Sequence, residues 1–325
     1  MSETTSTPTS SRTPTSSTSS SASAATAAPA SPLVVVTGAN GLVGEAVTRA
    51  LLQRGARVRA VVRRAGTAPA GAEEVVGSFA QADVAETVVV GADALVTTVH
   101  PMGSDRATQQ AVGVEATPAL VRAAHDAGVP LAVHLSTAAV HDRSPGVGDV
   151  DQDAPLVDDD AGDYPVTKRD TDAAIAALEG PTRVLVRPPA VLGPGESSVW
   201  NTLRPADARR DPSHLAGHPE RSFAWVHVED LAALVADVAT GRVPLADDPD
   251  RGPLAGGTTA VTVAGEPATW RDYAGTVAEA VGVEPAWSEE PGWSGQVRSD
   301  RARSWGWTPQ VTLAHALDEL RAGLR

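Results

Sequence analysis

The stretch Leu33-Val34-Val35-Val36-Thr37-Gly38-Ala39-Asn40-Gly41-Leu42-Val43-Gly44 decides the fold of this chain. Its four leading apolar residues are typical of a strand buried on both faces of a parallel sheet. A helical pattern follows and continues to Arg54. The glycines between the two permit a tight turn, close approach of the backbone to a pyrophosphate, and packing of the helix on the strand. Strand, glycine triplet and helix together predict a dinucleotide site, with the anion at the helix N-terminus.

The second predicted strand, residues 57–62, ends in Arg63 and Arg64. Sites that prefer NAD usually place an acidic residue here, which accepts a hydrogen bond from the ribose 2′-hydroxyl. Two guanidiniums instead suit a 2′-phosphate. We therefore expect NADP(H) to be the preferred cofactor and NAD(H) to be the alternative. The competing interpretation is that the two arginines belong to a solvated loop.

Further strand signals alternate with helical stretches along the chain. The strands are predicted over 73–76, 93–99, 131–135 and 182–186, and a helix over 105–127. This alternation with short links predicts an α/β fold with a doubly wound parallel sheet of the Rossmann type. Ligands in such folds bind beyond the carboxyl ends of the strands. The pocket candidates are therefore the residues that follow the strands: His100, Ser136, Thr137, Arg187, Pro188 and Pro189.

Composition excludes several classes of function. The net charge of −14 disfavours nucleic acid and anionic membranes as partners, so we expect a small-molecule substrate. The chain has no cysteine, which fits a reducing compartment, and we expect a cytoplasmic protein. Residues 1–31 are rich in Ser, Thr, Ala and Pro, and we predict a disordered tail. The histidines show no spacing typical of metal ligands, so we predict no metal.

Tyr164 and Lys168 form the most distinctive pair in the sequence. Lys168 is the only lysine among 26 basic residues, and Tyr164 is one of two tyrosines. Residues four apart share one face of a helix, so the phenol and the ammonium can converge on one reacting group. A nearby cation draws the pKa of a phenol from about 10 toward neutrality, which suits proton transfer to or from an oxygen. The alternative is a chance pair on a helix surface.

Five ordered motifs resemble those of the extended short-chain dehydrogenases/reductases, the group that contains the NAD(P)-dependent epimerases and dehydratases. They are the stretches 37–44, 135–141, 164–168, 187–195 and 225–231. The resemblance covers about Leu33 to the C-terminus. It implies that Tyr164 is the general acid/base, that Lys168 lowers the pKa of Tyr164 and binds the nicotinamide ribose, and that Thr137 orients the substrate oxygen. Thr137 could instead only cap a turn.

The resemblance also implies which residues contact ligands. Cofactor contacts are expected at Gly38, Asn40, Gly41, Leu42, Val43, Gly44, Arg63, Arg64, Thr98, Lys168, Pro188 and Val191. Substrate contacts are expected at His100, Ser136, His141 and Trp200. Dimerisation is common in the family, so a homodimer is compatible with the resemblance.

The chain departs from the family pattern at three places. His141 stands where Tyr is usual, and it either touches substrate or is a packing change. No acidic residue follows the third strand, where Ser78 and Phe79 stand, which weakens the expected adenine contact. Ala138 and Ala139 follow Thr137 where dehydratases carry an acidic pair, so dehydration is disfavoured.

After the tail, we predict a cofactor-binding domain, a helix that packs back on it, and a substrate-binding region. We also predict one leading function. Residues 32–190 form the NADP-binding domain, 225–240 pack back on it as a helix, and 191–224 with 241–325 form the substrate-binding region. The short segment before Phe223 favours a smaller or less charged carbonyl substrate, although its arginines could clamp an anion or lie in a solvated loop. The leading function is an oxidoreductase that transfers hydride between nicotinamide and a carbonyl or alcohol carbon. The alternatives are a nucleotide-sugar epimerase that retains its nicotinamide and a non-catalytic NADP(H) sensor.

Overall fold

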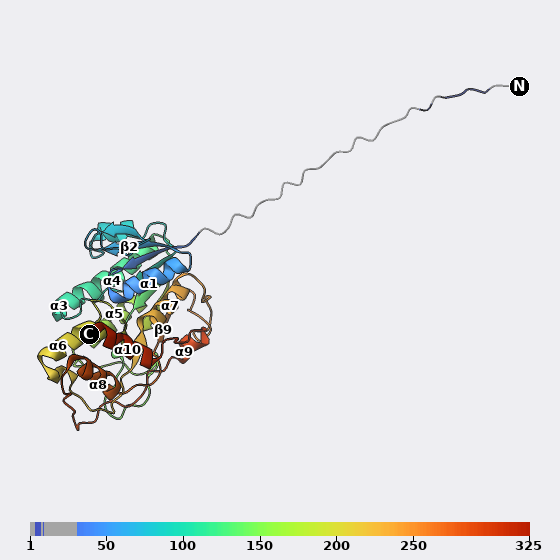
Figure 1. Ribbon diagram of the computed structural model, residues 1–325. Helices are drawn as coiled ribbons and strands as arrows, with labels where there is room; N and C mark the ends of the chain where they lie inside the picture. Colours follow the sequence, from blue (N-terminus) through green and yellow to red (C-terminus); the bar gives the residue numbers. More distant parts are fainter. Residues whose placement is uncertain (1–3, 8, 10–30) are drawn as a thin grey trace. The chain divides into compact units, whose positions relative to one another are not determined.

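The computed structural model describes residues 4–7, 9 and 31–325 (Figure 1). The chain divides into two units, residues 1–30 and 31–325. The disordered tail expected over residues 1–31 therefore falls almost entirely outside the described residues. The fold and the site below concern the second unit.

A seven-stranded parallel sheet forms the centre of this unit. Its strand order is β3-β2-β1-β4-β5-β6-β9, and every neighbouring pair is parallel. The predicted doubly wound α/β fold is confirmed. In chain order the strands are β1 (Leu33–Thr37), β2 (Arg57–Val62), β3 (Glu73–Val76), β4 (Ala94–Thr97), β5 (Leu131–Leu135), β6 (Thr182–Arg187) and β9 (Thr258–Thr262).

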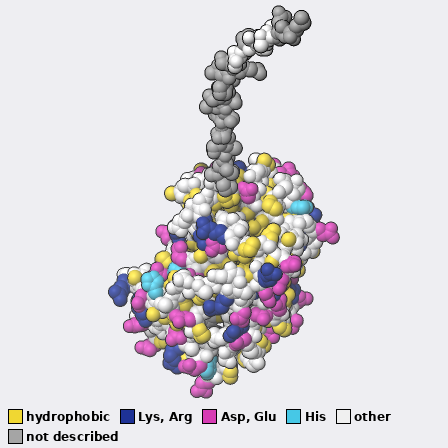
Figure 2. All heavy atoms as spheres, turned by 90° about the vertical axis from the view of Figure 1, so that its right-hand side faces the viewer, with side chains coloured by type: hydrophobic (Ala, Val, Ile, Leu, Met, Phe, Trp, Pro, Cys, Tyr) yellow, Lys and Arg dark blue, Asp and Glu magenta, His cyan; other side chains and the backbone are white. Residues whose placement is uncertain are grey.

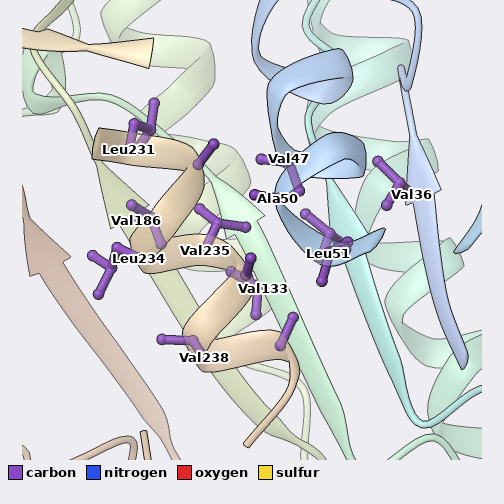
Figure 3. Packing of buried hydrophobic residues seen from close by; sticks show 14 of the residues in the cluster. Val36, Val47, Ala50, Leu51, Val133, Val186, Leu231, Leu234, Val235 and Val238 are labelled. Carbon is purple, nitrogen blue, oxygen red and sulfur yellow. The ribbon is translucent and has the colours of Figure 1, made fainter. Parts of the chain in front are cut away.

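Helices cover both faces of the sheet, because successive strand residues point to opposite faces. On one face, α1 (Leu42–Gln53) and α7 (Val228–Ala239) pack side by side over the sheet. Figure 3 shows Leu51 of α1 and Val235 of α7 in this core. The other face packs on α2 (Ala82–Val88), α4 (Thr117–Asp126) and α5 (Asp163–Ala176). Both faces of the sheet are thus buried under helices, which explains why β1 is a continuous apolar run.

Two predicted elements differ in detail from the structure. The strand expected over 93–99 ends at Thr97, and Thr98 turns to donate its hydroxyl to the Thr37 carbonyl at 2.7 Å. The helix expected over 105–127 consists of α3 (Arg106–Gln109), a π-helical turn over Gln110–Ala116 and α4. The π turn carries Gly113, where an added Cβ would lie 2.8 Å from the Thr171 hydroxyl of α5. The missing side chain lets the two helices approach closely.

The C-terminal lobe consists of the elements after β6, apart from α7, β9 and α9 (Asp300–Ser304), which belong to or pack on the main sheet. A short two-stranded sheet, β7 (Ala190–Leu192) and β8 (Trp225–His227), connects it to the main sheet, and Trp225, Trp270 and Tyr273 belong to its core. Its helices are α6 (Arg204–Arg210), α8 (Trp270–Val281) and α10 (Leu313–Leu324), with a π turn at Val199–Leu203 and a 3₁₀ turn at Pro212–Leu215. Within the predicted substrate-binding region 241–325, the strand β9 extends the main sheet beside β6.

Carboxylates are spread widely over the surface. Figure 2 shows acidic side chains over much of one face, with basic side chains mostly scattered between them. Among the described residues, no helix is long and apolar enough to cross a membrane.

Candidate active site

The glycine-rich turn between β1 and α1 is shaped by close backbone contacts. Gly38 has φ +70°, and an added Cβ would lie 2.8 Å from Thr98 Oγ1. An added Cβ at Gly44 would lie 2.0 Å from the Gly38 carbonyl oxygen. At Gly41 it would meet only that oxygen, at an ordinary 3.5 Å. Gly41 is also the N-cap of α1 and supplies no side-chain cap, so this helix N-terminus suits a pyrophosphate.

Alanine substitutions at Gly44 and Gly41 should affect two different properties, the stability of the fold and the affinity for the cofactor. Gly44→Ala is expected to lower the free energy of unfolding by about 2 kcal/mol or more, because the methyl meets rigid backbone. Gly41→Ala is expected to change it by about 1 kcal/mol or less, but to weaken NADPH binding about tenfold or more by blocking the anion. Denaturant unfolding and calorimetric titration with NADPH measure the two effects. Equal loss of stability in both variants would contradict this division.

A cavity of about 760 Å³ begins at this turn and runs along the carboxyl ends of the strands. Most of the predicted cofactor residues line it: Gly38, Gly41, Leu42, Val43, Gly44, Thr98, Lys168, Pro188 and Val191. Asn40 lies outside it and is exposed, with its amide 3.4 Å from Thr67 Oγ1. Arg63 and Arg64 are exposed on the loop after β2. Sequence reasoning missed Ser197, whose hydroxyl accepts a hydrogen bond from the Leu42 amide at 3.1 Å; no motif marks this serine.

The first turn of α5 brings Tyr164 to the cavity. Gly162, with φ +95°, turns the chain into the helix, and Pro165 is tolerated because its missing N–H lies in the first turn. Lys168 follows one turn later, is 3% exposed, and donates from Nζ to the Leu135 carbonyl at 2.7 Å. Thr137 comes from the carboxyl end of β5 and lines the same cavity, where its hydroxyl lowers the pKa of Tyr164. The structure thus brings the three predicted catalytic residues to one cavity.

Thr137 also has the capping role that was its alternative interpretation. Its hydroxyl accepts a hydrogen bond from the Ala139 amide at 3.1 Å and caps the 3₁₀ turn Ala138–Val140. The cap holds the hydroxyl in place beside Tyr164, so the two roles are compatible.

The pKa of Tyr164 is controlled differently from the expectation. Burial raises the pKa of this phenol above its ordinary value, while the hydrogen bond with Thr137 and the charge of Arg143 lower it. Lys168 is not among these influences, because its nitrogen is turned to the Leu135 carbonyl. The expected role of Lys168 in lowering the pKa of Tyr164 is therefore taken by Thr137 and Arg143 in this structure.

A buried acidic group lies one further turn along α5. Asp172 is 3% exposed and pairs with Arg187, whose Nε lies 3.0 Å from Oδ2. Burial lowers the pKa of Lys168 to about 8, and Asp172 opposes this effect. Burial raises the pKa of Asp172 itself, and Arg187 opposes that. Asp172 is thus a counter-ion that both buried cations share, and it favours the charged form of Lys168.

The four predicted substrate residues have different positions. His100 lines the cavity and meets the ring of Tyr164 edge-on, with centroids 5.0 Å apart. Ser136 and Trp200 also line it. His141 does not: it is 1% exposed, with Nδ1 3.0 Å from the Ala154 carbonyl and Nε2 3.2 Å from Arg187. His141 is a packing residue, because the backbone of the loop and the guanidinium occupy both ring nitrogens.

Three arginines that were not predicted as site residues line the far half of the cavity. They are Arg143, Arg204 and Arg221. Arg143 follows β5 by eight residues and has no motif that marks it, and Arg204 could not be told from its neighbours. Arg209 and Arg210 of the same segment point elsewhere, to the Leu324 carbonyl and to Asp207. Only the fold of α6 separates the cavity arginine from the surface ones.

Comparisons with known proteins agree with this geometry. A family model described as "NAD dependent epimerase/dehydratase family" matches residues 34–243. A Stigmatella aurantiaca protein named 4-hydroxy-2-methyl-3-oxo-4-farnesyl-3,4-dihydroquinoline-1-oxide ketoreductase is 29% identical over 77% of this chain and 73% of its own length. A Caulobacter vibrioides ceramide reductase is 30% identical over 66% of this chain and 64% of its own length. An Agrobacterium tumefaciens short-chain dehydrogenase/reductase superfamily protein, solved with bound NAD, shares the fold with TM-score 0.69 and 22% identity, covering 90% of this chain and 96% of that one.

Proposed function

This chain belongs to the NAD dependent epimerase/dehydratase family, and on that premise we propose that it is an NADP(H)-dependent oxidoreductase acting on a carbonyl or alcohol carbon. The observation that carries the proposal is that Tyr164, Thr137 and the buried Lys168 line one wall of the cavity that begins at the glycine turn. A phenol at the wall of a cavity can give or take a proton on a substrate oxygen, and a second hydroxyl can orient that oxygen. The reductase names of the two relatives support an oxidoreductase.

In the proposed reaction, Tyr164, Thr137 and Arg143 each have a separate role. In the reducing direction, the phenol of Tyr164 donates its proton to the carbonyl oxygen as that oxygen gains negative charge. The Thr137 hydroxyl can donate to the same oxygen, while Thr137 and the charge of Arg143 favour the phenolate that forms. Oxidation of the alcohol runs through the same contacts in reverse. The bound nicotinamide supplies or accepts the hydride at the carbon.

The structure offers fitting contacts for the pyrophosphate and the 2′-phosphate of the cofactor. The uncapped start of α1 and the open position of Gly41 suit the pyrophosphate. Arg63 and Arg64 are exposed, and within the described residues no carboxylate is in ion-pair distance of either. Their guanidiniums are thus available to a 2′-phosphate, which is why we propose NADP(H) over NAD(H).

The function is tested by supplying the purified protein with NADPH or NADH and a panel of aldehydes and ketones. We expect net oxidation of NADPH, followed by the loss of its absorbance, with a lower KM than for NADH. Replacing both Arg63 and Arg64 by serine should raise the KM for NADPH about 10- to 100-fold through lost charge-assisted hydrogen bonds, and leave that for NADH unchanged. Arg57→Gln, at the opposite end of β2, is the matched control.

Two outcomes would overturn the proposal. Turnover of UDP-sugars without net consumption of NADPH would assign an epimerase instead. Tight binding of NADPH without turnover of any carbonyl in the panel would indicate a sensor.

A further inference from the structure

The half of the cavity away from the glycine turn combines indole rings with guanidiniums. Trp200 and Trp270 belong to an aromatic cluster that also contains Phe223. The Cζ atom of Arg204 lies 4.6 Å from the Trp200 ring centroid, and that of Arg221 lies 4.0 Å from the Trp270 centroid. Arg204 also lies 6.0 Å from Trp270, so one indole contacts both cations.

Neither cation is neutralised by the protein. Within residues 31–325, no carboxylate lies in ion-pair distance of Arg204 or Arg221, whereas buried Arg187 is paired with Asp172. Among the residues that the structure describes, Arg204 donates only to the His214 carbonyl, at 3.2 Å. The Nε atom of Arg221 is buried and has no hydrogen-bond partner among the described residues. Arg204 and Arg221 are partly buried, and buried polar groups are normally hydrogen-bonded. The described residues leave Nε of Arg221 without a partner, which an anion bound in the cavity can supply.

The two cations also destabilise each other. The charge of Arg204, added to burial, lowers the pKa of Arg221. Gly217 and Gly292 leave the space that Arg221 occupies, since added Cβ atoms there would lie 3.0 Å from its guanidinium and 2.6 Å from its Cβ. The fold therefore keeps Arg221 in a position that electrostatics disfavours in the absence of an anion.

A guanidinium stacked on an indole keeps its N–H edge free in its own plane. Carboxylates and phosphates accept hydrogen bonds from that edge, often two at a time. We propose that the substrate carries an anionic group, a carboxylate or a phosphate, which Arg204 and Arg221 bind while its apolar body lies against Trp200. The inference rests on the proposed function, since it places the reacting carbon of the same molecule at Tyr164. The sequence left two alternatives for the arginines of the segment before Phe223, an anion clamp or a solvated loop. This inference selects the anion clamp.

Binding of matched probes tests the clamp without requiring turnover. The full chain, saturated with NADP⁺ to occupy the cofactor site, is titrated calorimetrically with benzoate, phenyl phosphate, benzamide and benzyl alcohol. We expect at least one anion to bind about tenfold or more tightly than both neutral probes. The tighter of the two anions identifies the group as carboxylate or phosphate.

Arginine variants locate the effect. Arg221→Gln and Arg204→Gln are each expected to weaken the anion about tenfold or more and to leave the neutral probes unchanged. Arg221→Lys, which keeps the charge but not the fork, should lie between the wild type and Arg221→Gln. Arg210→Gln, on the surface of α6, is the control and should bind like the wild type. Thermal unfolding of each variant shows that it remains folded.

Equal binding of anions and neutral probes, no detectable binding of either anion, or equal loss in Arg210→Gln would each overturn the inference. These results are distinguishable from failure of the proposed function. An anion that binds through Arg221 in a protein that oxidises no NADPH would leave the clamp standing and remove the oxidoreductase. NADPH oxidation without preference for anions would do the opposite.

Discussion

Tyr164→Phe is expected to lower kcat by about 10²- to 10⁴-fold, the usual contribution of a positioned general acid. The substitution removes only the oxygen that carries the transferred proton. The ring, and with it the edge-on contact to His100, is retained. NADPH affinity should therefore stay within about twofold of wild type, because uniform binding is unaffected. Steady-state kinetics with the most active carbonyl of the panel, together with NADPH titration, measure the two quantities.

The second tyrosine of the chain is a matched control. Tyr273 is completely buried in the C-terminal lobe and donates its hydroxyl to the Trp200 carbonyl at 2.7 Å. Tyr273→Phe should lower the free energy of unfolding by about 1 kcal/mol or more, since it leaves a buried acceptor unpaired. Its turnover should fall far less than that of Tyr164→Phe. Full activity in Tyr164→Phe would show that another group carries the proton.

Lys168→Met is expected to lower kcat/KM about 100-fold or more, because it removes the ammonium that the family resemblance assigns to the nicotinamide ribose and so misplaces the cofactor. It should also change the pH profile. The pKa of Lys168 is lowered to about 8 by burial, so the ammonium is lost as pH rises through that value. Wild-type activity should therefore decline above about pH 8, and this decline should be absent in the residual activity of Lys168→Met. Arg169→Gln, at the next position of α5, should retain the decline because Arg169 faces Asp159 and Asp170.

Stability should depend on pH in the opposite sense. The folded pKa of Lys168 lies below the unfolded value of about 10.4, so between these two values only the unfolded chain holds the proton. The contribution of Lys168 to the free energy of unfolding therefore rises with pH across this window. If activity falls above pH 8 while stability does not fall, the loss of activity is assigned to deprotonation of the Lys168 ammonium. If the pH profile of activity is the same for Lys168→Met and for wild type, a group other than Lys168 causes the decline.

Local patterns in the sequence were sufficient to predict the nucleotide-binding half of the fold. The apolar run at β1, the glycine spacing and the four-residue step from Tyr164 to Lys168 follow from backbone geometry that neighbouring residues impose on each other. The family to which the chain belongs was predicted from those motifs and is confirmed. The short strand β9 was missed, because five residues of mixed polarity carry little signal without the neighbouring β6.

What the sequence determined by itself is the sheet, the turn at Gly38–Gly44 and the spacing of the catalytic pair, since each depends on contacts within one or two turns of chain. Only the tertiary structure decided what surrounds that pair. Arg143 and Thr137 set the pKa of Tyr164 against burial, and His141 is directed into the packing beneath the site. Likewise, Arg204 and Arg221 meet on Trp270 although the three residues lie far apart in the chain. Burial and charge proximity between distant segments depend on how the lobes pack, and no local pattern encodes them.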